Sequence, residues 1–289
     1  MGGTLHFEAP TALEYFAALV ADDASFSVVE AAVAVAQDEY PQLDPQDVLA
    51  QIDSLADKLK RRLPADAAPL QKLRLLNRYF FHELGFAGNV NDYYDARNSY
   101  LPEVLKTRRG IPITLALLYV EVATQLGLSA SGVSFPGHFL VKLRMPRGEV
   151  VIDPFSGQSL SREELDERLM PFRRQRGLVG EFEAPLGLFL QSAPPRDVIA
   201  RLLRNLKEIH RTAADWPRLL AVLQRLVILL PQAWEERRDR GLAQAELGHD
   251  ALAAEDLALY LEQRPDADDA APLRLRLREL RGPGASRLH

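Results

Sequence analysis

Cysteine is absent from all 289 residues of this chain, and its absence excludes several classes of site. Without a thiol the chain has no disulfide, no thiolate ligand for a metal and no cysteine nucleophile. This composition suits a reducing compartment, so we expect a cytoplasmic protein. The six histidines lack the spacing of a metal site, and no glycine-rich phosphate loop occurs. We therefore expect no metal and no cofactor.

Positive charge in excess and long apolar runs are also missing. The net charge is −5, and an acidic balance argues against broad nucleic-acid binding, which needs a basic face. No uncharged apolar run approaches the ~20 residues of a membrane span. The first eight residues lack the basic and apolar regions of a signal peptide. We expect partners that are neither nucleic acid nor membrane.

The patterns that are present predict an α+β fold. The first ninety residues predict helices, among them one that Asp44-Pro45 opens and that carries an apolar stripe at helical spacing. Strands are predicted only later, over 131–135, 139–143 and 149–152. The turn Met145-Pro146-Arg147-Gly148 joins the last two as a hairpin. We therefore expect a helical N-terminal region and a core with a small antiparallel sheet.

The C-terminal part of the chain repeats itself. Pro231 and Pro265 are 34 residues apart with similar flanks, and Leu223 falls on Leu257 at the same offset. Paired helices that end before a proline at this period are typical of tetratricopeptide repeats. The pattern predicts two domains, 1–193 and an all-α domain over 194–289. Such repeats offer a helical surface to a protein or peptide partner.

A helix start, a histidine and an aspartate follow one another in an order that suggests a shared site. Pro112 suits the first turn of an apolar helix predicted over 113–128. His138 and Asp153 lie at the strands of the predicted hairpin. If paired residue numbers there add up to about 291, the two side chains project to one face with Cβ atoms ~5 Å apart. A carboxylate in that position fixes the tautomer of an imidazole.

Each of these residues also has a purely structural interpretation. His138 follows Pro-Gly and Asp153 precedes a proline, so either residue can simply belong to a turn. Thr114 is the one residue at the helix start that could serve as a nucleophile. A threonine at this position is more often an ordinary first-turn residue.

Two polar residues ahead of the helix complete the candidate cleft, together with Pro112. Arg109 can hold a carboxylate or phosphate beside the positive end of the helix, or pair with Asp92 or Asp95. Asn98 most simply caps the short helix predicted over 100–107. Alternatively, its amide lines the cleft as a donor.

Two stretches of the sequence carry a resemblance to a known family. The first extends from Asn98 to Phe155 and includes Arg108-Arg109-Gly110-Ile111-Pro112, Phe135-Pro136-Gly137-His138 and Ile152-Asp153-Pro154-Phe155. The second is Glu235–Leu242 with the segment that follows it. These motifs resemble the SirB-type family of bacterial proteins over most of the chain. The resemblance implies a transglutaminase-like, papain-like core followed by tetratricopeptide-like repeats.

The same resemblance implies a damaged catalytic site. Transglutaminase-like enzymes use Cys, His and Asp, and His138 and Asp153 match two of these positions. The cysteine position falls near Pro112, where the chain has no thiol. We therefore predict a non-catalytic protein-binding or adaptor protein. The alternative is a hydrolase or acyl-transfer enzyme in which the His138–Asp153 pair activates water or Thr114.

Overall fold

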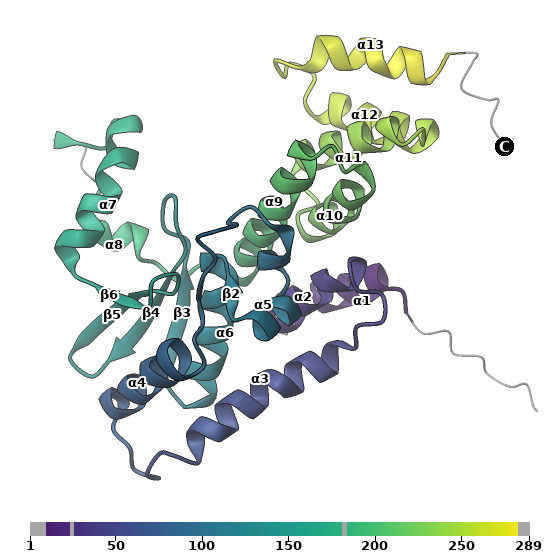
Figure 1. Cartoon of the computed structure of the whole chain (residues 1–289). Helices are drawn as coiled ribbons and strands as arrows, with labels where there is room; N and C mark the ends of the chain where they lie inside the picture. The colour runs from purple at the N-terminus through teal and green to yellow at the C-terminus, as the bar shows by residue number, and fades with distance from the viewer. Residues whose placement is uncertain (1–9, 24–25, 181–183, 283–289) are drawn as a thin grey trace, which may run out of the picture. The chain divides into compact units, whose positions relative to one another are not determined.

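The computed structural model describes residues 10–23, 26–180 and 184–282. Its contacts divide the chain into two compact units. The first unit contains Ser27–Ala36 and Gln42–Leu202, and the second contains the residues up to Phe26, Gln37–Pro41 and the chain from Leu203 onward. Helices predominate and strands occur only in the first unit among the described residues, so the predicted α+β class is confirmed (Figure 1).

In the first unit, a layer of helices precedes the sheet. The predicted N-cap Asp44 is confirmed, because its carboxylate accepts the Gln46 N–H at 2.8 Å and Pro45 occupies the first turn of α3. The helix buries its apolar stripe at Val48, Ile52, Leu55 and Leu59. The helical elements of this part are α2 (Val28–Val35), α3 (Pro45–Lys60), α4 (Pro69–Asn77), the π-helix η2 (Arg78–Glu83), α5 (Leu101–Thr107) and α6 (Pro112–Gln125).

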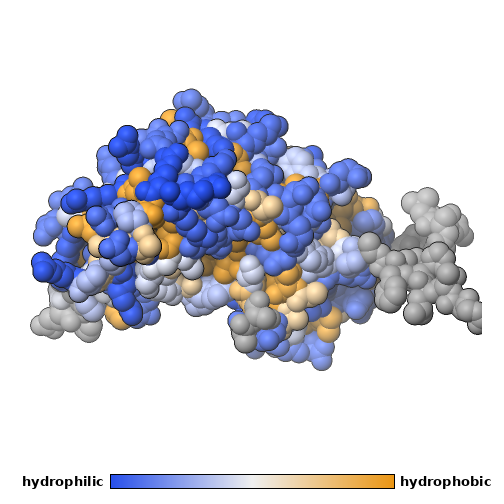
Figure 2. Space-filling view, turned by 90° about the horizontal axis from the view of Figure 1, so that it is seen from below, coloured by the Kyte–Doolittle hydropathy of each residue, from blue (hydrophilic) through white to orange (hydrophobic). Residues whose placement is uncertain are grey.

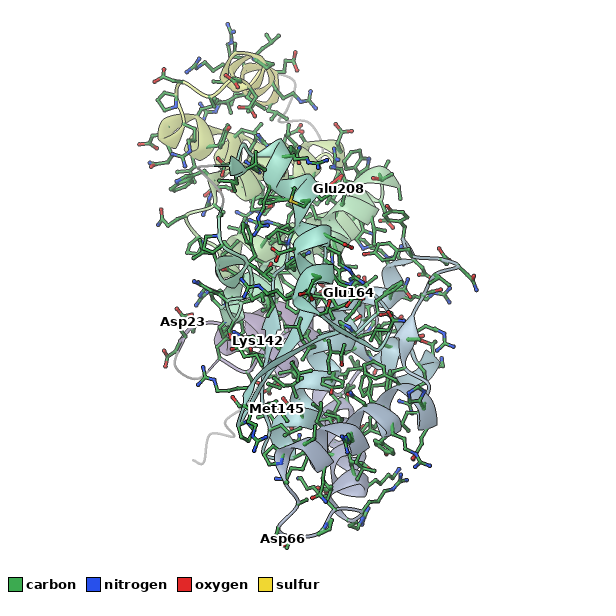
Figure 3. All side chains as sticks on the ribbon, turned by 90° about the vertical axis from the view of Figure 1, so that its left-hand side faces the viewer. Asp23, Asp66, Lys142, Met145, Glu164 and Glu208 are labelled. Atoms are coloured by element: carbon green, nitrogen blue, oxygen red, sulfur yellow. The ribbon has the colours of Figure 1, made fainter. Side chains whose placement is uncertain are left out.

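The predicted hairpin is confirmed and belongs to a four-stranded antiparallel sheet. Its order is β3 (Ser129–Val133), β4 (Leu140–Met145), β5 (Gly148–Asp153) and β6 (Gln158–Leu160), each strand paired with the next. Met145 marks the tip of the β4–β5 hairpin, and Lys142 lies farther along the same strand (Figure 3). The sequence did not predict β6, which is three residues long and follows a tight turn at Gly157 with φ of 75°.

Helices cover the sheet and bury its apolar residues. Leu140, Val151 and Leu160 of the sheet pack in one cluster with Leu165 and Leu169 of α7 (Arg162–Gln175). The short helix α8 (Leu186–Phe189) adds a residue to the same cluster. The apolar helix α6 lies against β3 and β4 and is buried on most of its circumference. This packing fixes the sheet relative to the start of α6.

A short parallel strand pair connects the start of α6 to the loop over residues 89–95. β1 (Ala87–Gly88) pairs with β2 (Arg109–Gly110), so Gly88 lies opposite Gly110, two residues before Pro112. The loop then forms the 3₁₀ turn η3 (Ala96–Ser99) ahead of α5. The segment is therefore ordered by backbone pairing.

The second unit contains the repeats. Both ends of α12 (Asp250–Gln263) lie 34 residues beyond those of α10 (Trp216–Leu229), which confirms the predicted period. The repeats also contain α11 (Trp234–Glu246) and α13 (Ala270–Leu280), and the second unit includes α9 (Pro195–Thr212) from Leu203 onward. A Cβ at Gly241 would lie 3.1 Å from the Cβ of Asp256, so its glycine allows α11 and α12 to approach closely.

The expected division at residues 193 and 194 falls just ahead of α9, whereas the contacts divide the chain inside this helix. The N-terminal segment also packs with the repeats. Helix α1 (Ala12–Leu19) packs on α10, and the buried guanidinium of Arg225 in α10 lies 2.6 Å from the Asp38 carboxylate in η1 (Ala36–Asp38). Helix α1 and most of η1 therefore belong to the second unit with the repeats.

The exposed surface is mainly polar. Hydrophilic residues predominate on the face that Figure 2 shows, interrupted by hydrophobic patches. The helices of the described residues include none that is both long and apolar enough to cross a membrane.

Candidate functional site

The structure brings His138 and Asp153 into direct contact in the first unit. Nε2 of His138 lies 2.8 Å from Oδ1 of Asp153. The aspartate side chain is 6 % exposed and the histidine side chain 24 % exposed. A buried carboxylate therefore supports an imidazole that solvent can reach.

The strand register that led to this expectation is wrong, although the contact exists. In the ladder Val141 pairs with Ile152, so paired numbers add up to 293 instead of about 291. His138 precedes β4 and lies in a turn, where its N–H donates to the Phe135 carbonyl at 3.0 Å. The turn carries the imidazole back toward Asp153 at the end of β5. The contact is thus made by a turn and a strand end, not by two directly paired strand residues.

Three neighbours determine the charge state of Asp153. Burial raises the pKa of this carboxyl. The hydrogen bonds from His138, from Arg168 and from the Phe155 N–H lower the pKa by more than burial raises it, so the net pKa lies below the ordinary value. The Arg168 guanidinium donates to Oδ2 at 3.1 Å, and the Phe155 N–H donates to Oδ1 at 2.9 Å. Asp153 is therefore ionised at neutral pH and accepts only.

An ionised Asp153 fixes the tautomer of His138. Because the carboxylate has no proton to donate, Nε2 carries the hydrogen in the 2.8 Å bond. In the neutral imidazole, Nδ1 is then the nitrogen that can accept a proton. This arrangement can position a general base, but a base needs a nucleophile or a substrate proton within reach.

Aromatic side chains surround the pair. The Phe155 ring lies 6.5 Å from the imidazole and 5.9 Å from the Tyr93 ring, and Tyr94 stacks edge-on against Tyr93 at 5.3 Å. Tyr93 is 43 % exposed and Tyr94 is 79 % exposed, as is the neighbouring Val90 at 75 %. We call Tyr93 and Tyr94 the aromatic rim. It is an apolar surface that solvent reaches beside His138.

Backbone contacts connect the pair to the start of α6. The Gly88 N–H donates to the Phe155 carbonyl at 2.9 Å, and the Asn89 N–H donates to the Gly110 carbonyl at 3.0 Å. A Cβ at Gly88 would lie 2.2 Å from the Phe155 ring, so only glycine fits beneath that ring. Strand β1 thus lies between the Asp153–Phe155 turn and the residues that open α6.

Thr114 has a structural role. Its side chain is fully buried, and its hydroxyl lies 2.8 Å from the Asn98 carbonyl and 3.1 Å from the Ile111 carbonyl. The same oxygen accepts the Ile111 N–H at 3.2 Å. A buried hydroxyl that both donates and accepts backbone hydrogen bonds is poorly placed to attack a substrate.

The predicted cleft residues stabilise the backbone around the site. Asn98 does not cap α5, as the simplest interpretation expected, because its amide instead donates to the Asp92 and Tyr93 carbonyls at 2.7 and 3.2 Å. Arg109 pairs with neither Asp92 nor Asp95 and donates to the Gly85 carbonyl at 2.6 Å. Pro112 is buried in the first turn of α6. Asn98 therefore holds the aromatic rim in place.

The sequence did not reveal several residues around His138. Arg168 lies on α7, and no sequence signal shows which face of that helix meets Asp153. Arg201 donates to the Ser134 hydroxyl at 2.7 Å and to the Phe135 carbonyl at 3.3 Å, which fixes the turn before His138. Phe155 follows Asp153-Pro154, and that motif was the one available signal. In the described parts of the chain, no group of three or more acidic or histidine side chains is arranged to hold a metal.

Comparisons with known proteins give the same domain order. The profile of the transglutaminase-like superfamily matches residues 46–204, and a tetratricopeptide repeat profile matches residues 206–278. These matches confirm the predicted architecture of a transglutaminase-like core followed by repeats.

Similar full-length proteins occur in several bacteria. A UPF0162 protein of Xylella fastidiosa (strain 9a5c) is 39 % identical over 262 residues, which cover 90 % of this chain and 92 % of the relative. The UPF0162 protein PA3419 of Pseudomonas aeruginosa is 30 % identical over 91 % of this chain and 94 % of its own length. The UPF0162 protein YchA of Escherichia coli (strain K12) is 30 % identical over 79 % of this chain and 82 % of its own length. No solved structure matches the chain significantly.

Proposed function

We propose that this chain, which belongs to the UPF0162 family and to the transglutaminase-like superfamily, is a non-catalytic protein that binds a protein or peptide partner. The missing nucleophile carries the proposal. The whole chain contains no cysteine, and the Thr114 hydroxyl at the start of α6 is buried and hydrogen-bonded. Acyl transfer at a transglutaminase-like site needs a thiolate. Neither a cysteine nor the Thr114 hydroxyl is then available to the His138–Asp153 pair as a nucleophile.

Two surfaces support a binding role. Tetratricopeptide repeats generally present a helical surface to other proteins. In this chain Leu242 and Leu275 of the repeats are large, apolar and exposed. The aromatic rim offers Tyr93 and Tyr94 beside His138, and aromatic residues are enriched in protein interfaces. We assign the partner principally to the repeats, with the rim as a second contact.

Three further parts of the proposal rest on the sequence. We keep the SirB-type affiliation because of the motifs between Asn98 and Phe155. We place the protein in the cytoplasm because its composition suits a reducing compartment. We place the functional boundary at residues 193 and 194, so that α9 belongs entirely with the repeats. The gap between the two matched profiles, at residues 204 to 206, lies inside α9.

A substrate panel tests the absence of catalysis. Amide, ester and glutaminyl substrates are incubated with the wild type and with a double variant that carries His138→Ala and Thr114→Val. We expect no turnover by the wild type above that of the double variant. Turnover that disappears on changing either residue would disprove the non-catalytic proposal.

Surface variants test where a partner binds. Proteins retained from a bacterial lysate are quantified for the wild type, Leu242→Glu in the repeats and Tyr94→Ala in the rim. Leu70→Glu, at a residue of α4 that is 49 % exposed, is the matched control. We expect a protein that the wild type and Leu70→Glu retain and Leu242→Glu loses. Equal retention by all variants would contradict the assignment to the repeats.

One observation favours a second candidate function, a hydrolase that uses water. The 2.8 Å contact keeps His138 oriented by an ionised carboxylate, as a general base requires. Under this alternative, the substrate panel gives turnover that His138→Ala abolishes and Asp153→Asn strongly reduces, while Thr114→Val leaves it intact. The response of Thr114→Val separates a water mechanism from a covalent one.

A further inference from the structure

A second polar site lies in the first unit, between α3 and the end of α5, and shares no residue with the His138–Asp153 pair. It is a pocket of about 210 Å³. Its polar lining residues, Gln51, Ser54, Lys58 and Arg108, can all donate hydrogen bonds, and two leucines complete the wall. No carboxylate occurs among the described residues that line it. The pocket therefore combines two positive charges with no negative one.

Arg108 is held in an unusual backbone conformation at this pocket. It is the C-cap of α5 with φ of 60° and ψ of 20°, a left-handed conformation that residues other than glycine seldom adopt. Its N–H donates to the Val104 carbonyl at 2.9 Å, and its guanidinium lies 4.7 Å from the centre of the Phe86 ring. The strained backbone and the ring together direct the guanidinium to a fixed position.

The guanidinium of Arg108 lacks a charged partner in the described parts of the chain. Its terminal nitrogen Nη1 is buried and has no hydrogen-bond partner there. Burial lowers the pKa of this arginine, which agrees with a cation removed from water without a carboxylate beside it. A buried donor with no acceptor costs free energy.

Lys58 supplies the second charge. It follows Ser54 by four residues and Gln51 by seven on α3, so the three side chains share one face of the helix. Lys60, on the same helix, lies 3.1 Å from the Asp57 carboxylate, but Lys58 has no such ion pair among the described residues. Two unneutralised cations thus face one small volume.

We propose that this pocket binds the phosphate group of a small phosphate monoester, an activity that goes beyond the proposed partner binding. The planar guanidinium of Arg108 offers two parallel N–H donors to two phosphate oxygens. The Lys58 ammonium supplies a second positive charge, and Ser54 and Gln51 donate from the α3 side. Two positive charges and donors from several directions match a tetrahedral dianion better than a carboxylate, which carries one charge on two oxygens.

A titration monitored by NMR tests the proposal. Inorganic phosphate or glycerol phosphate is added to the full chain at constant ionic strength. We expect saturable shifts around Arg108 and Lys58 for both probes, and affinity about tenfold weaker for acetate. Because the second pKa of a phosphate monoester is about 6, binding is tighter at pH 7.5 than at pH 5.5.

Three variants locate the site. Arg108→Gly suits the left-handed backbone, so the variant folds, and we expect phosphate affinity to fall about tenfold or more. Lys58→Gln weakens binding less, and the control Lys60→Gln leaves it unchanged because Lys60 is already paired. Absence of saturable binding by the wild type, or equal losses in Lys58→Gln and Lys60→Gln, would overturn the proposal. So would unchanged binding by a folded Arg108→Gly.

Discussion

Each of the two units buries an aspartate among positive partners, and the two sites differ in the chemistry of those partners. Asp153 in the first unit contacts His138 and Arg168, whose side chains are 24 % and 40 % exposed. Asp256 in the repeats accepts from Arg240 at 2.6 and 2.7 Å and from Arg237 at 3.4 Å. A guanidinium only donates, whereas a neutral imidazole also has a nitrogen that can accept a proton.

This difference separates a structural carboxylate from one that belongs to a site. Asp256 lies beneath Gly241, and its two arginines come from α11, so the cluster holds α11 against α12. Asp153 instead faces a solvent-accessible imidazole beside an exposed aromatic rim. Burial alone would have given the two aspartates equal weight as site candidates. The exposure of the partner distinguishes them.

The largest effect is expected for Asp256→Ala. The variant leaves the guanidinium groups of Arg237 and Arg240 largely buried without a carboxylate, so the free energy of unfolding falls by about 3–5 kcal/mol. Urea denaturation followed by circular dichroism measures the change. Glu262→Ala, at an exposed position of the same helix, is the control and changes the free energy of unfolding little. A small effect of Asp256→Ala would show that the cluster does not hold α11 against α12.

Gly88→Ala should be next in size. The new methyl group overlaps the Phe155 ring, which must move away from Gly88, and overpacking of this kind costs about 1–3 kcal/mol. Because the Phe155 N–H donates to Asp153, the NMR signals of the His138 ring should shift as well. Unchanged signals from His138 would show that β1 does not influence the position of the His138 ring.

Thr114→Val tests whether the hydroxyl at the start of α6 is structural. Valine keeps the shape but leaves the buried Ile111 N–H without an acceptor, so the free energy of unfolding falls by about 1–2 kcal/mol. Thermal unfolding measures the loss, and Thr107→Val, at an exposed threonine, is the control. A variant as stable as the wild type would contradict the claim that the Thr114 hydroxyl stabilises the fold.

Asp153→Asn should have the smallest effect at neutral pH, about 1 kcal/mol, because water reaches both His138 and Arg168. Its pH dependence sharpens the comparison. The pKa of Asp153 is lowered in the folded state, so its contribution is fully present above the unfolded pKa of about 3.9 and is lost as pH falls through the folded value. Stability of wild type and variant, measured from pH 7 down to pH 2, should therefore converge in acid. A difference that grows in acid would contradict the lowered pKa.

The sequence predicted the features that repeat or alternate. The stripe of Val48, Ile52 and Leu55 and the 34-residue offset of the repeats each involve many residues, so one misplaced position does not hide them. The His138–Asp153 contact was also predicted, but from the wrong register, because the hairpin turn is centred on Pro146-Arg147 and not on Met145-Pro146.

Contacts between distant elements could not be predicted. Arg168 reaches Asp153 from α7, and Asn98 bonds to loop carbonyls instead of capping α5, because each choice depends on tertiary packing. The pocket at Arg108 depends on a left-handed backbone, which sequence patterns do not assign to an arginine.

Release of ammonia from a glutaminyl peptide tests the central claim most directly, because an intact transglutaminase-like site would catalyse it. Wild type, His138→Ala, Asp153→Asn and the control His249→Ala, at an exposed histidine of the repeats, are compared at neutral pH. We predict that none of the four releases ammonia faster than the peptide alone. Release by the wild type and His249→Ala that both His138→Ala and Asp153→Asn abolish would contradict the account and show a working catalytic site.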